Sequence, residues 1–332
     1  MISPLALTMG EPAGIGGEIT MKAWRDHRDT LPTFFVIDCP HRLSNLANRL
    51  KWTIPICTID DPSEATDVFK NALPVLEQPV TNGDPGVISK HTGKSVIASI
   101  ERAVALAQAG DAAAVVTNPI HKHALHQCGF DFPGHTEFLA DLAGIDTHPI
   151  MMLACDDLRV VPITVHVSLQ DAIHQLSEDL IVEKCLITAE ALKRRAGIEN
   201  PKLALAGLNP HAGEDGDMGS EEIDIITPAI KRLKDYGIDV MGPMPPDTMF
   251  HKAARDRYDV AMCMYHDQGL IPIKTLAFDE GVNVTLGLPF IRTSPDHGTA
   301  LNIAGAGTAS ETSLVSAIKM AGKMAERQQA HS

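Results

Sequence analysis

The stretch VAMCMYHDQGLIPIK, residues 260–274, joins an apolar run to a histidine, an aspartate and a turn on glycine. A short apolar run bounded by turn-forming residues is typical of a buried strand, so we predict a strand over Val260–Met264. Two other apolar runs close in the same way, VVPITVH at His166 and LALAGLNPH at His211. In open α/β sheets, ligands bind outside the carboxyl ends of the strands. We therefore expect these two histidines and His266 at one ligand-binding edge.

Strand-like and helix-like segments alternate along the chain. Strands are predicted over Leu5–Thr8, Phe34–Ile37, Ala113–Thr117, Ile150–Leu153, Val160–Val165, Leu203–Gly207, Val260–Met264 and Val284–Leu286. Helices are predicted over Ile15–Arg25, Val96–Ala109, Thr136–Ala143, Leu180–Arg195, Glu221–Tyr236 and Thr312–Glu326. This alternation indicates an α/β fold with a largely parallel sheet. A length of 332 residues is natural for two lobes.

Composition excludes some classes of protein. The formal net charge of −14 argues against nucleic acid as the main partner, because a phosphate backbone requires a basic face. Six cysteines without a CxxC pair are typical of buried thiols in a reducing compartment. No stretch approaches the roughly 18 apolar residues that a membrane helix needs. We expect a soluble cytoplasmic protein.

Three imidazoles at one edge of a sheet could bind a divalent cation and leave positions open for a substrate. All-nitrogen ligation suits Zn, Co or Ni better than Mg, which prefers oxygen. The alternative is that His166, His211 and His266 are separate hydrogen-bonded or surface residues. The histidines of the HKHALHQ stretch fit a solvated helix face.

Two segments rich in small residues are candidate nucleotide loops. Residues 9–18, MGEPAGIGGE, lead from the first strand into a helix, although their spacing is not GxGxxG. Residues 296–307, DHGTALNIAGAG, form the second segment. Glycines allow a ligand to approach the backbone and a helix N-terminus closely. The alternative for both segments is a tight turn without a ligand.

Several polar residues are candidates for binding an anionic substrate. Thr136 is predicted to cap the helix TEFLADLAG, which would leave free backbone N–H groups beside His135. Lys274 follows the His266 strand, Asn283 opens the strand NVTLGLPF, and Arg292 lies among apolar neighbours. The alternative for the two cations is an internal salt bridge.

At these residues the chain resembles the PdxA family, the 4-hydroxythreonine-4-phosphate dehydrogenases of vitamin B6 biosynthesis. The matching segments are TMGEPAGIG, TNPIHK, PGHTEF, LNPHAGEDG, MYHDQGLIPIK and GVNVTLGLPFIRTSPDHGTALNIAG. The resemblance covers nearly the whole chain. It implies a homodimer of two-lobed α/β/α subunits, similar in fold to isocitrate and isopropylmalate dehydrogenases. It also implies an active site at the dimer interface, with residues from both chains.

The resemblance implies a role for each candidate residue. Residues 1–130 plus roughly 300–332 would form the cofactor-side domain, and residues 131–299 the metal, substrate and dimerisation domain. A divalent metal (Zn, Co or Mg) would bind His166, His211 and His266. The small anionic phosphorylated substrate would contact His135, Thr136, Lys274, Asn283 and Arg292. NAD or NADP would lie near Gly14, Gly16, His297, Gly298, Thr299 and Ala300. Asn302 stands where related enzymes often have an acidic residue, which leaves the choice of nucleotide open.

The family reaction oxidises 4-phosphohydroxy-L-threonine with NAD(P)+ to 2-amino-3-oxo-4-phosphooxybutanoate, which loses CO2 to give 3-amino-2-oxopropyl phosphate. Asp247 and Asp267 are candidate proton acceptors, and each could instead orient an imidazole; we favour that second role for Asp267. A related dehydrogenase acting on a tetronate 4-phosphate or an aromatic cis-dihydrodiol carboxylate would share the same motifs. Two other classes are less well matched. A metal- or phosphate-binding protein without redox chemistry would not need the two glycine-rich loops, and a phosphate acyltransferase gives no reason for a three-histidine metal site.

Overall fold

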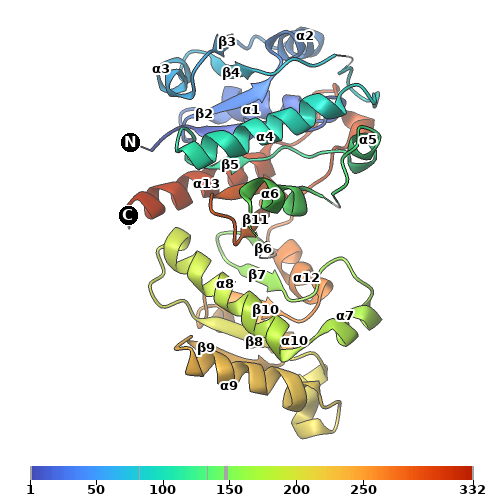
Figure 1. Cartoon of the computed structure of the whole chain (residues 1–332), viewed down its shortest axis with the longest axis vertical. Helices are drawn as coiled ribbons and strands as arrows, with labels where there is room; N and C mark the ends of the chain where they lie inside the picture. Colours follow the sequence, from blue (N-terminus) through green and yellow to red (C-terminus); the bar gives the residue numbers. More distant parts are fainter. Residues whose placement is uncertain (1, 82, 133, 146–148, 331–332) are drawn as a thin grey trace. The chain divides into compact units, whose positions relative to one another are not determined.

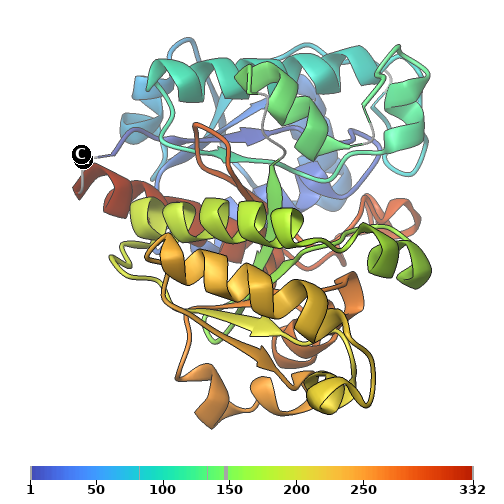
Figure 2. The ribbon, with the colours of Figure 1, turned by 60° about the horizontal axis from the view of Figure 1, so that its bottom comes forward.

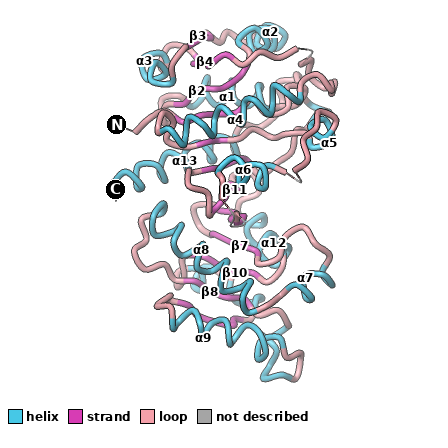
Figure 3. The backbone as a smooth tube through the Cα atoms, viewed as in Figure 1, coloured by secondary structure: helices cyan, strands magenta, loops and turns pink. Residues whose placement is uncertain are grey.

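The computed structural model describes residues 2–81, 83–132, 134–145 and 149–330, in which strands and helices alternate (Figure 3). The chain forms two compact units. The first comprises Met1–Pro149 and Leu288–Gln329, and most of the second is Ile150–Gly287. The predicted α/β architecture is therefore confirmed. Within the described residues, no helix combines the length and apolar character that crossing a membrane requires.

The sheet of the first unit is parallel throughout. Its strands, in spatial order, are β3 (Ile56–Ile59), β4 (Leu73–Glu77), β2 (Phe34–Asp38), β1 (Leu5–Thr8), β5 (Val115–Val116) and β12 (Arg292–Pro295). Every residue of β1 and β2 is buried. Parallel strands covered on both faces read as continuous apolar runs, which is why these two strands could be predicted.

Helices flank this sheet (Figure 1). They are α1 (Gly16–His27), α2 (Pro40–Leu50), η1 (Pro62–Glu64), α3 (Ala65–Val68), α4 (Gly93–Ala109), α5 (Lys122–His126), α6 (His135–Ala143), η4 (Leu301–Ile303) and α13 (Thr312–Ala330). Helix α4 packs against β1, β2 and β5 through residues that include Val96, Ile100 and Val104. It ends at Gly110, whose φ of +85° is the left-handed conformation that glycine adopts readily.

The sheet of the second unit is mixed. Its strands, in spatial order, are β11 (Val282–Leu286), β6 (Ile150–Ala154), β7 (Arg159–Pro162), β10 (Val260–Cys263), β8 (Leu203–Ala206) and β9 (Val240–Met244). Strand β6 is antiparallel to β11 and β7, whereas β7, β10, β8 and β9 run parallel. The carboxyl ends of β7, β10 and β8 therefore meet at one edge.

The helices of the second unit include one long helix, α8, and several short ones. They are α7 (Leu169–Gln175), α8 (Glu178–Ala196), η2 (Pro210–Gly216), η3 (Glu222–Ile226), α9 (Thr227–Asp235), α10 (Pro246–Met249), α11 (Lys252–Arg255) and α12 (His266–Leu276). Helices α8 and α9 lie side by side (Figure 2). Ser177 caps α8 through a bond from Leu180 N, and the helix has acidic residues in its first turn and basic residues in its last. This distribution complements the helix dipole.

The units differ in their bounds from the predicted domains, 1–130 plus roughly 300–332 and 131–299. The residues after 130 stay with the first unit because Phe138 and Leu139 of α6 lie in its apolar core. Leu288 and Phe290 belong to the same core, and β12 pairs with β5. The chain therefore returns to the first unit at Leu288, before the predicted boundary. The roles assigned to the two domains remain predictions.

Candidate active site

Two of the three histidines predicted as metal ligands lie together beyond the carboxyl ends of β7 and β10. The rings of His166 and His266 have centroids 5.6 Å apart. Bonds beyond the strands hold this arrangement, because Thr164 donates to Met264 O through both its backbone nitrogen (3.3 Å) and its hydroxyl (2.8 Å). His166 has a left-handed φ of +55°, a conformation that costs energy in residues other than glycine.

The paired histidines line a cavity of about 250 Å³, together with Thr164, Tyr265 and Asp267. His266 Nδ1 lies 2.7 Å from Asp267 Oδ1. A carboxylate at Nδ1 fixes the ring orientation and leaves Nε2 available to bind a cation. The donor chemistry of this pair therefore fits a divalent transition metal.

His211 is not joined to this pair. Across the described ranges, no group of three or more His, Cys, Asp and Glu side chains is close enough to hold a metal ion. The His211 side chain is 62% exposed, and its Nδ1 lies 3.2 Å from Glu214 Oε2. It lies in η2, where six consecutive residues, from His211 to Gly216, have positive φ. One described chain therefore supplies two adjacent imidazoles of the expected three.

Buried polar side chains hold the loop that carries His211. Glu222, which is 3% exposed, accepts hydrogen bonds from the backbone and side-chain nitrogens of Asn209 at 2.7 and 2.9 Å. Gln268 donates to Gly207 O and accepts from Met264 N. We did not predict a role for Glu222 or Gln268. Glu222 follows His211 in the sequence and Gln268 follows His266. This nearness to a predicted metal ligand was the one sequence feature that could have indicated a supporting role.

The other predicted residues of the second unit lie on neighbouring elements. Asp247 is exposed on α10, which packs against η2. Lys274 lies in the last turn of α12, with its Nζ 5.7 Å from the ring centroid of Phe278. Asn283 is on β11, and its Oδ1 is buried without a hydrogen-bond partner among the described residues. A buried acceptor without a donor is costly, so it marks a position where a ligand could donate.

His135, Thr136 and Arg292 belong to the first unit. The prediction that Thr136 is an N-cap is wrong, because α6 begins at His135 and its N-cap is Gly134 without a side-chain bond. His135 Nε2 is buried and has no partner in the described part of the chain. Burial lowers the pKa of His135 well below its usual value, and the nearby charges of Arg292 and Lys122 lower it further. The imidazole is therefore neutral at physiological pH.

Arg292 is a buried cation, only 3% exposed. Its Nη2 donates to Thr117 Oγ1 over 2.6 Å. Burial lowers the pKa of Arg292 to about 10, so the guanidinium remains charged at neutral pH. Lys122 lies in the same region, since a Cβ added to Gly134 would be 3.4 Å from Lys122 Nζ. Arg292, Lys122 and a neutral histidine together could bind an anionic group.

The two candidate nucleotide loops lie against each other in the first unit. Ile15 N donates to Thr299 O over 3.1 Å. A Cβ on Gly14 would be 2.9 Å from Thr299 O, and a Cβ on Gly16 would be 2.9 Å from Met9 O. Neither position has room for a side chain, so both require glycine. The bond from Ile15 and the close approach of Gly14 show that the first loop contacts Thr299 of the HGTA segment, residues 297–300.

The HGTA segment follows β12. His297 Nδ1 lies 3.0 Å from Gly298 O, and its Nε2 is buried without a partner in the ranges described. Ala300 has a left-handed φ of +43°. A Cβ added to Gly298 would meet no atom within 4 Å. The backbone beside Gly298 is therefore open to a ligand.

Comparison with known proteins gives one consistent family. The family model described as "Pyridoxal phosphate biosynthetic protein PdxA" matches residues 30–321. The chain is 52% identical to 4-hydroxythreonine-4-phosphate dehydrogenase of Bradyrhizobium diazoefficiens, over 97% of this chain and 97% of that protein. It is 49% identical to the protein of the same name from Methylorubrum populi, over 98% of this chain and 95% of that one.

Solved structures agree with these sequence matches. The 4-hydroxythreonine-4-phosphate dehydrogenase of Klebsiella pneumoniae superimposes with a TM-score of 0.90 and 39% identity, over 98% of both chains. A terephthalate 1,2-cis-dihydrodiol dehydrogenase from Burkholderia xenovorans superimposes with a TM-score of 0.67 and 27% identity, over 97% of this chain and 98% of that one.

Proposed function

Since the chain belongs to the PdxA family, we propose that it oxidises the secondary alcohol of 4-phosphohydroxy-L-threonine with NAD+ or NADP+. The product, 2-amino-3-oxo-4-phosphooxybutanoate, then loses CO2 to give 3-amino-2-oxopropyl phosphate, a step in pyridoxal phosphate biosynthesis. The observation that carries this proposal is the 52% identity, over 97% of both chains, to a 4-hydroxythreonine-4-phosphate dehydrogenase.

A divalent cation, which we propose is zinc, cobalt or magnesium, would be held by His166, His266 and His211. When bound, it supplies positive charge that stabilises an anionic oxygen on the reacting carbon. Asp267 orients His266, because its carboxylate accepts the Nδ1 proton. That role leaves Asp247, on the helix packed against the His211 turn, as the residue proposed to accept the hydroxyl proton.

The substrate carries a phosphate and a carboxylate, and the proposed contacts match these charges. In the first unit, Arg292 supplies a buried cation and His135 a neutral imidazole whose Nε2 has no partner among the described atoms. In the second unit, Lys274 supplies an ammonium group and Asn283 an amide. Thr136, in the first turn of α6, supplies a hydroxyl and a backbone N–H. The nucleotide would bind along Gly14, Gly16 and residues 297–300.

We propose that the enzyme is a homodimer in which a second copy completes the metal site. Two observations support this. One described chain brings only His166 and His266 together. Large apolar side chains are also exposed on and near α7 and α12, namely Val167, Leu169, Ile173, Ile271, Leu276 and Phe278. Exposed apolar side chains gathered on one unit are typical of a surface that a partner covers.

Mixing inactive variants tests the shared site. His166→Ala, His211→Ala and His266→Ala are each expected to be inactive alone. If one ligand comes from the partner, two of the three pairwise mixtures should recover about a quarter of the wild-type activity, because half of the dimers are hybrids with one intact site. The pair that fails to recover would identify the two ligands from the same chain. No recovery in any mixture would contradict the shared site.

The reaction is tested by incubating the purified protein with NAD+ or NADP+ and a panel of alcohols, and following reduced nicotinamide by absorbance. Turnover of 4-phosphohydroxy-L-threonine with release of CO2 is the expected result. If the protein oxidises a terephthalate cis-dihydrodiol or a tetronate 4-phosphate and not 4-phosphohydroxy-L-threonine, the proposed substrate is wrong. Lack of NAD(P) binding would instead favour a metal- or phosphate-binding protein without redox chemistry.

A further inference from the structure

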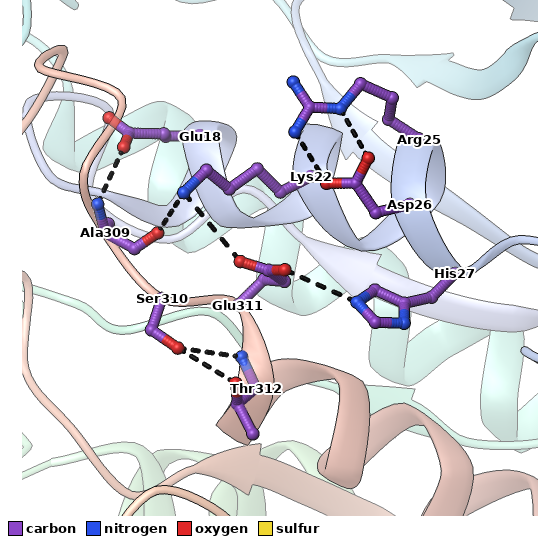
Figure 4. Close-up of polar contacts among 9 residues, drawn as sticks. All are labelled: Glu18, Lys22, Arg25, Asp26, His27, Ala309, Ser310, Glu311 and Thr312. Carbon is purple, nitrogen blue, oxygen red and sulfur yellow. Dashed lines mark hydrogen bonds and ion pairs between the residues drawn. The ribbon is translucent and has the colours of Figure 1, made fainter.

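Polar side chains of α1 contact residues 305–311, which follow the HGTA segment, and Figure 4 shows the contacts to Ala309 and Glu311. The carboxylate of Glu18 accepts two backbone hydrogen bonds from this stretch. Its Oε2 lies 3.0 Å from Gly305 N, and its Oε1 lies 3.1 Å from Ala309 N. Glu18 is completely buried, so these N–H groups take the place of water around the carboxylate.

The next turn of α1 continues this contact. Lys22 Nζ donates to Ala309 O over 2.5 Å and lies 3.8 Å from Glu311 Oε2. The other oxygen of Glu311 is 3.4 Å from His27 Nε2. Glu18 and Lys22 have i, i+4 spacing and share a helix face, so a single rigid helix holds both ends of the 305–309 turn.

The same helix is joined to the HGTA segment where the helix begins. Ile15 is the N-cap of α1, and its backbone nitrogen donates to Thr299 O. Between Thr299 and Ala309, the segment has only the three residues of η4 as regular structure, and Gly305 and Gly307 have positive φ. Gly305 and Gly307 pack close to their neighbours, since a Cβ added to them would lie 2.7 Å from Pro85 Cβ and 3.4 Å from Leu50 Cδ2. The Glu18 carboxylate holds the backbone amides of Gly305 and Ala309, so the conformation of this segment depends in part on the bonds from α1.

We infer that Glu18 is a positioning residue for nucleotide binding: it holds residues 299–309 in the conformation that accepts NAD(P). This inference rests on the nucleotide site proposed above. Ordering a loop costs conformational entropy, and that cost weakens binding when it arises on association. The Glu18 carboxylate removes the cost in advance, because its two oxygens fix two amides four residues apart.

Glu18→Gln is the direct test, because it keeps the shape of the side chain and replaces one acceptor oxygen with an NH2 group. That NH2 group would face a backbone N–H. Loss of one charge-assisted bond predicts that the Kd for NAD(P) and the KM for the nucleotide rise about 10-fold or more. The kcat and the KM for the alcohol should not change. Hydrogen exchange should accelerate at the Gly305 and Ala309 amides in the absence of nucleotide.

Asp26→Asn is the matched control. Asp26 is on the same helix and pairs with Arg25 at 2.6 Å, and Figure 4 draws no hydrogen bond or ion pair from it to Ala309, Ser310 or Glu311. The control should leave nucleotide affinity and amide exchange unchanged. If Glu18→Gln does not fold, Glu18→Asp keeps the charge but shortens the side chain by one methylene, so it should lose at least one of the two amide bonds. It should likewise raise the Kd for the nucleotide and the exchange rate.

Two outcomes would overturn the inference. One is nucleotide affinity equal to wild type in folded Glu18→Gln, or in Glu18→Asp where that variant is used instead. The other is an equal loss of nucleotide and alcohol affinity, which would indicate a general structural role. Neither result contradicts the proposed dehydrogenase activity, provided that the wild type binds NAD(P). Failure of the wild type to bind either nucleotide would overturn the proposed function itself.

Discussion

The side-chain amide nitrogen of Gln268 lies 2.7 Å from the carbonyl oxygen of Gly207. The amide oxygen of the same side chain accepts from Met264 N over 2.6 Å. One buried side chain therefore joins the loops that follow β8 and β10. These loops lead directly into η2, which contains His211, and into α12, which begins at His266. The spacing of the two loops depends on a residue that need not touch the cation.

Gln268→Met should lower the free energy of unfolding by about 1–3 kcal/mol, because it leaves a buried carbonyl and a buried amide without partners. It should also weaken metal binding about 10-fold or more, as losses of supporting contacts around metal ligands do. Urea denaturation and cobalt titration measure the two effects. Gln175→Met, at an exposed position on α7, is the control and should change neither quantity. Wild-type metal affinity in Gln268→Met would show that the link does not position the ligands.

Gly14 and Gly298 lie in the two candidate nucleotide loops but differ in the space around them. Gly14→Ala should lower the melting temperature, because its Cβ would lie 2.9 Å from Thr299 O. Gly298→Ala should leave the melting temperature unchanged, since its Cβ meets no atom within 4 Å. It should nevertheless weaken NAD(P) binding, because the methyl group would occupy space proposed for the ligand. Nucleotide titration of Gly298→Ala that matches wild type would count against the HGTA segment as the binding loop.

His135 should make the protein less stable in acid. Its pKa is lower in the folded chain than the value of about 6.5 in the unfolded chain, so unfolding takes up protons once the pH falls below that value. Stability from the neutral ring is therefore present above about pH 6.5 and is lost as the pH falls below it. His135→Gln should show a shallower fall in the free energy of unfolding between about pH 7 and pH 5, measured by urea denaturation.

The control for this titration is His123→Gln, at an exposed position on α5. Its stability should follow the wild-type pH dependence. If the free energy of unfolding of wild type and of His135→Gln falls equally steeply with pH, the folded protein does not keep His135 neutral.

Arg292→Met should separate substrate binding from stability. Arg292→Met relieves the desolvation of a buried charge but leaves the buried Thr117 Oγ1 without its donor, so the free energy of unfolding should fall by about 1–3 kcal/mol. Loss of a cation that contacts an anionic group should raise the KM for the phosphorylated substrate about 10- to 100-fold. Steady-state kinetics and urea denaturation measure the two effects. The control is Arg194→Met, because the Arg194 side chain is 73% exposed on α8. An unchanged KM would remove Arg292 from the substrate site.

The strands that could be predicted are those whose sequence is dominated by burial. Runs such as LALT and VAMC are buried at every residue, so their apolar character identified β1 and β10. Strand β3 is half-exposed, and β9 contains Gly242 and Pro243, so neither shows a strand pattern. Helix α12 was missed because Gly269 and Pro272 lie within it. Its packing against β7 and β10 overrides those local preferences.

The candidate site divides in the same way. Parallel pairing of β7, β10 and β8 follows from the alternating pattern, and it explains why His166 and His266 meet. The position of His211 depends on six consecutive positive φ values and on bonds to Glu222, which no periodicity encodes. The prediction for Thr136 failed because the backbone, not a side chain, begins α6. Glu18 and Ala309, which form a polar contact, are 291 positions apart in the sequence. Contacts of this kind leave no local sequence pattern from which they could be predicted.

Cobalt(II) titration, followed by visible absorbance and by metal analysis, tests the proposed metal site most directly. We predict one cobalt ion per chain with the spectrum of a nitrogen-ligated site. His166→Ala, His211→Ala and His266→Ala should each reduce affinity about 100-fold or more, beyond the loss expected for a supporting residue. His174→Ala, at an exposed position on α7, should bind as wild type does. Unchanged cobalt binding in all three ligand variants would contradict a histidine-bound cation as the centre of this enzyme.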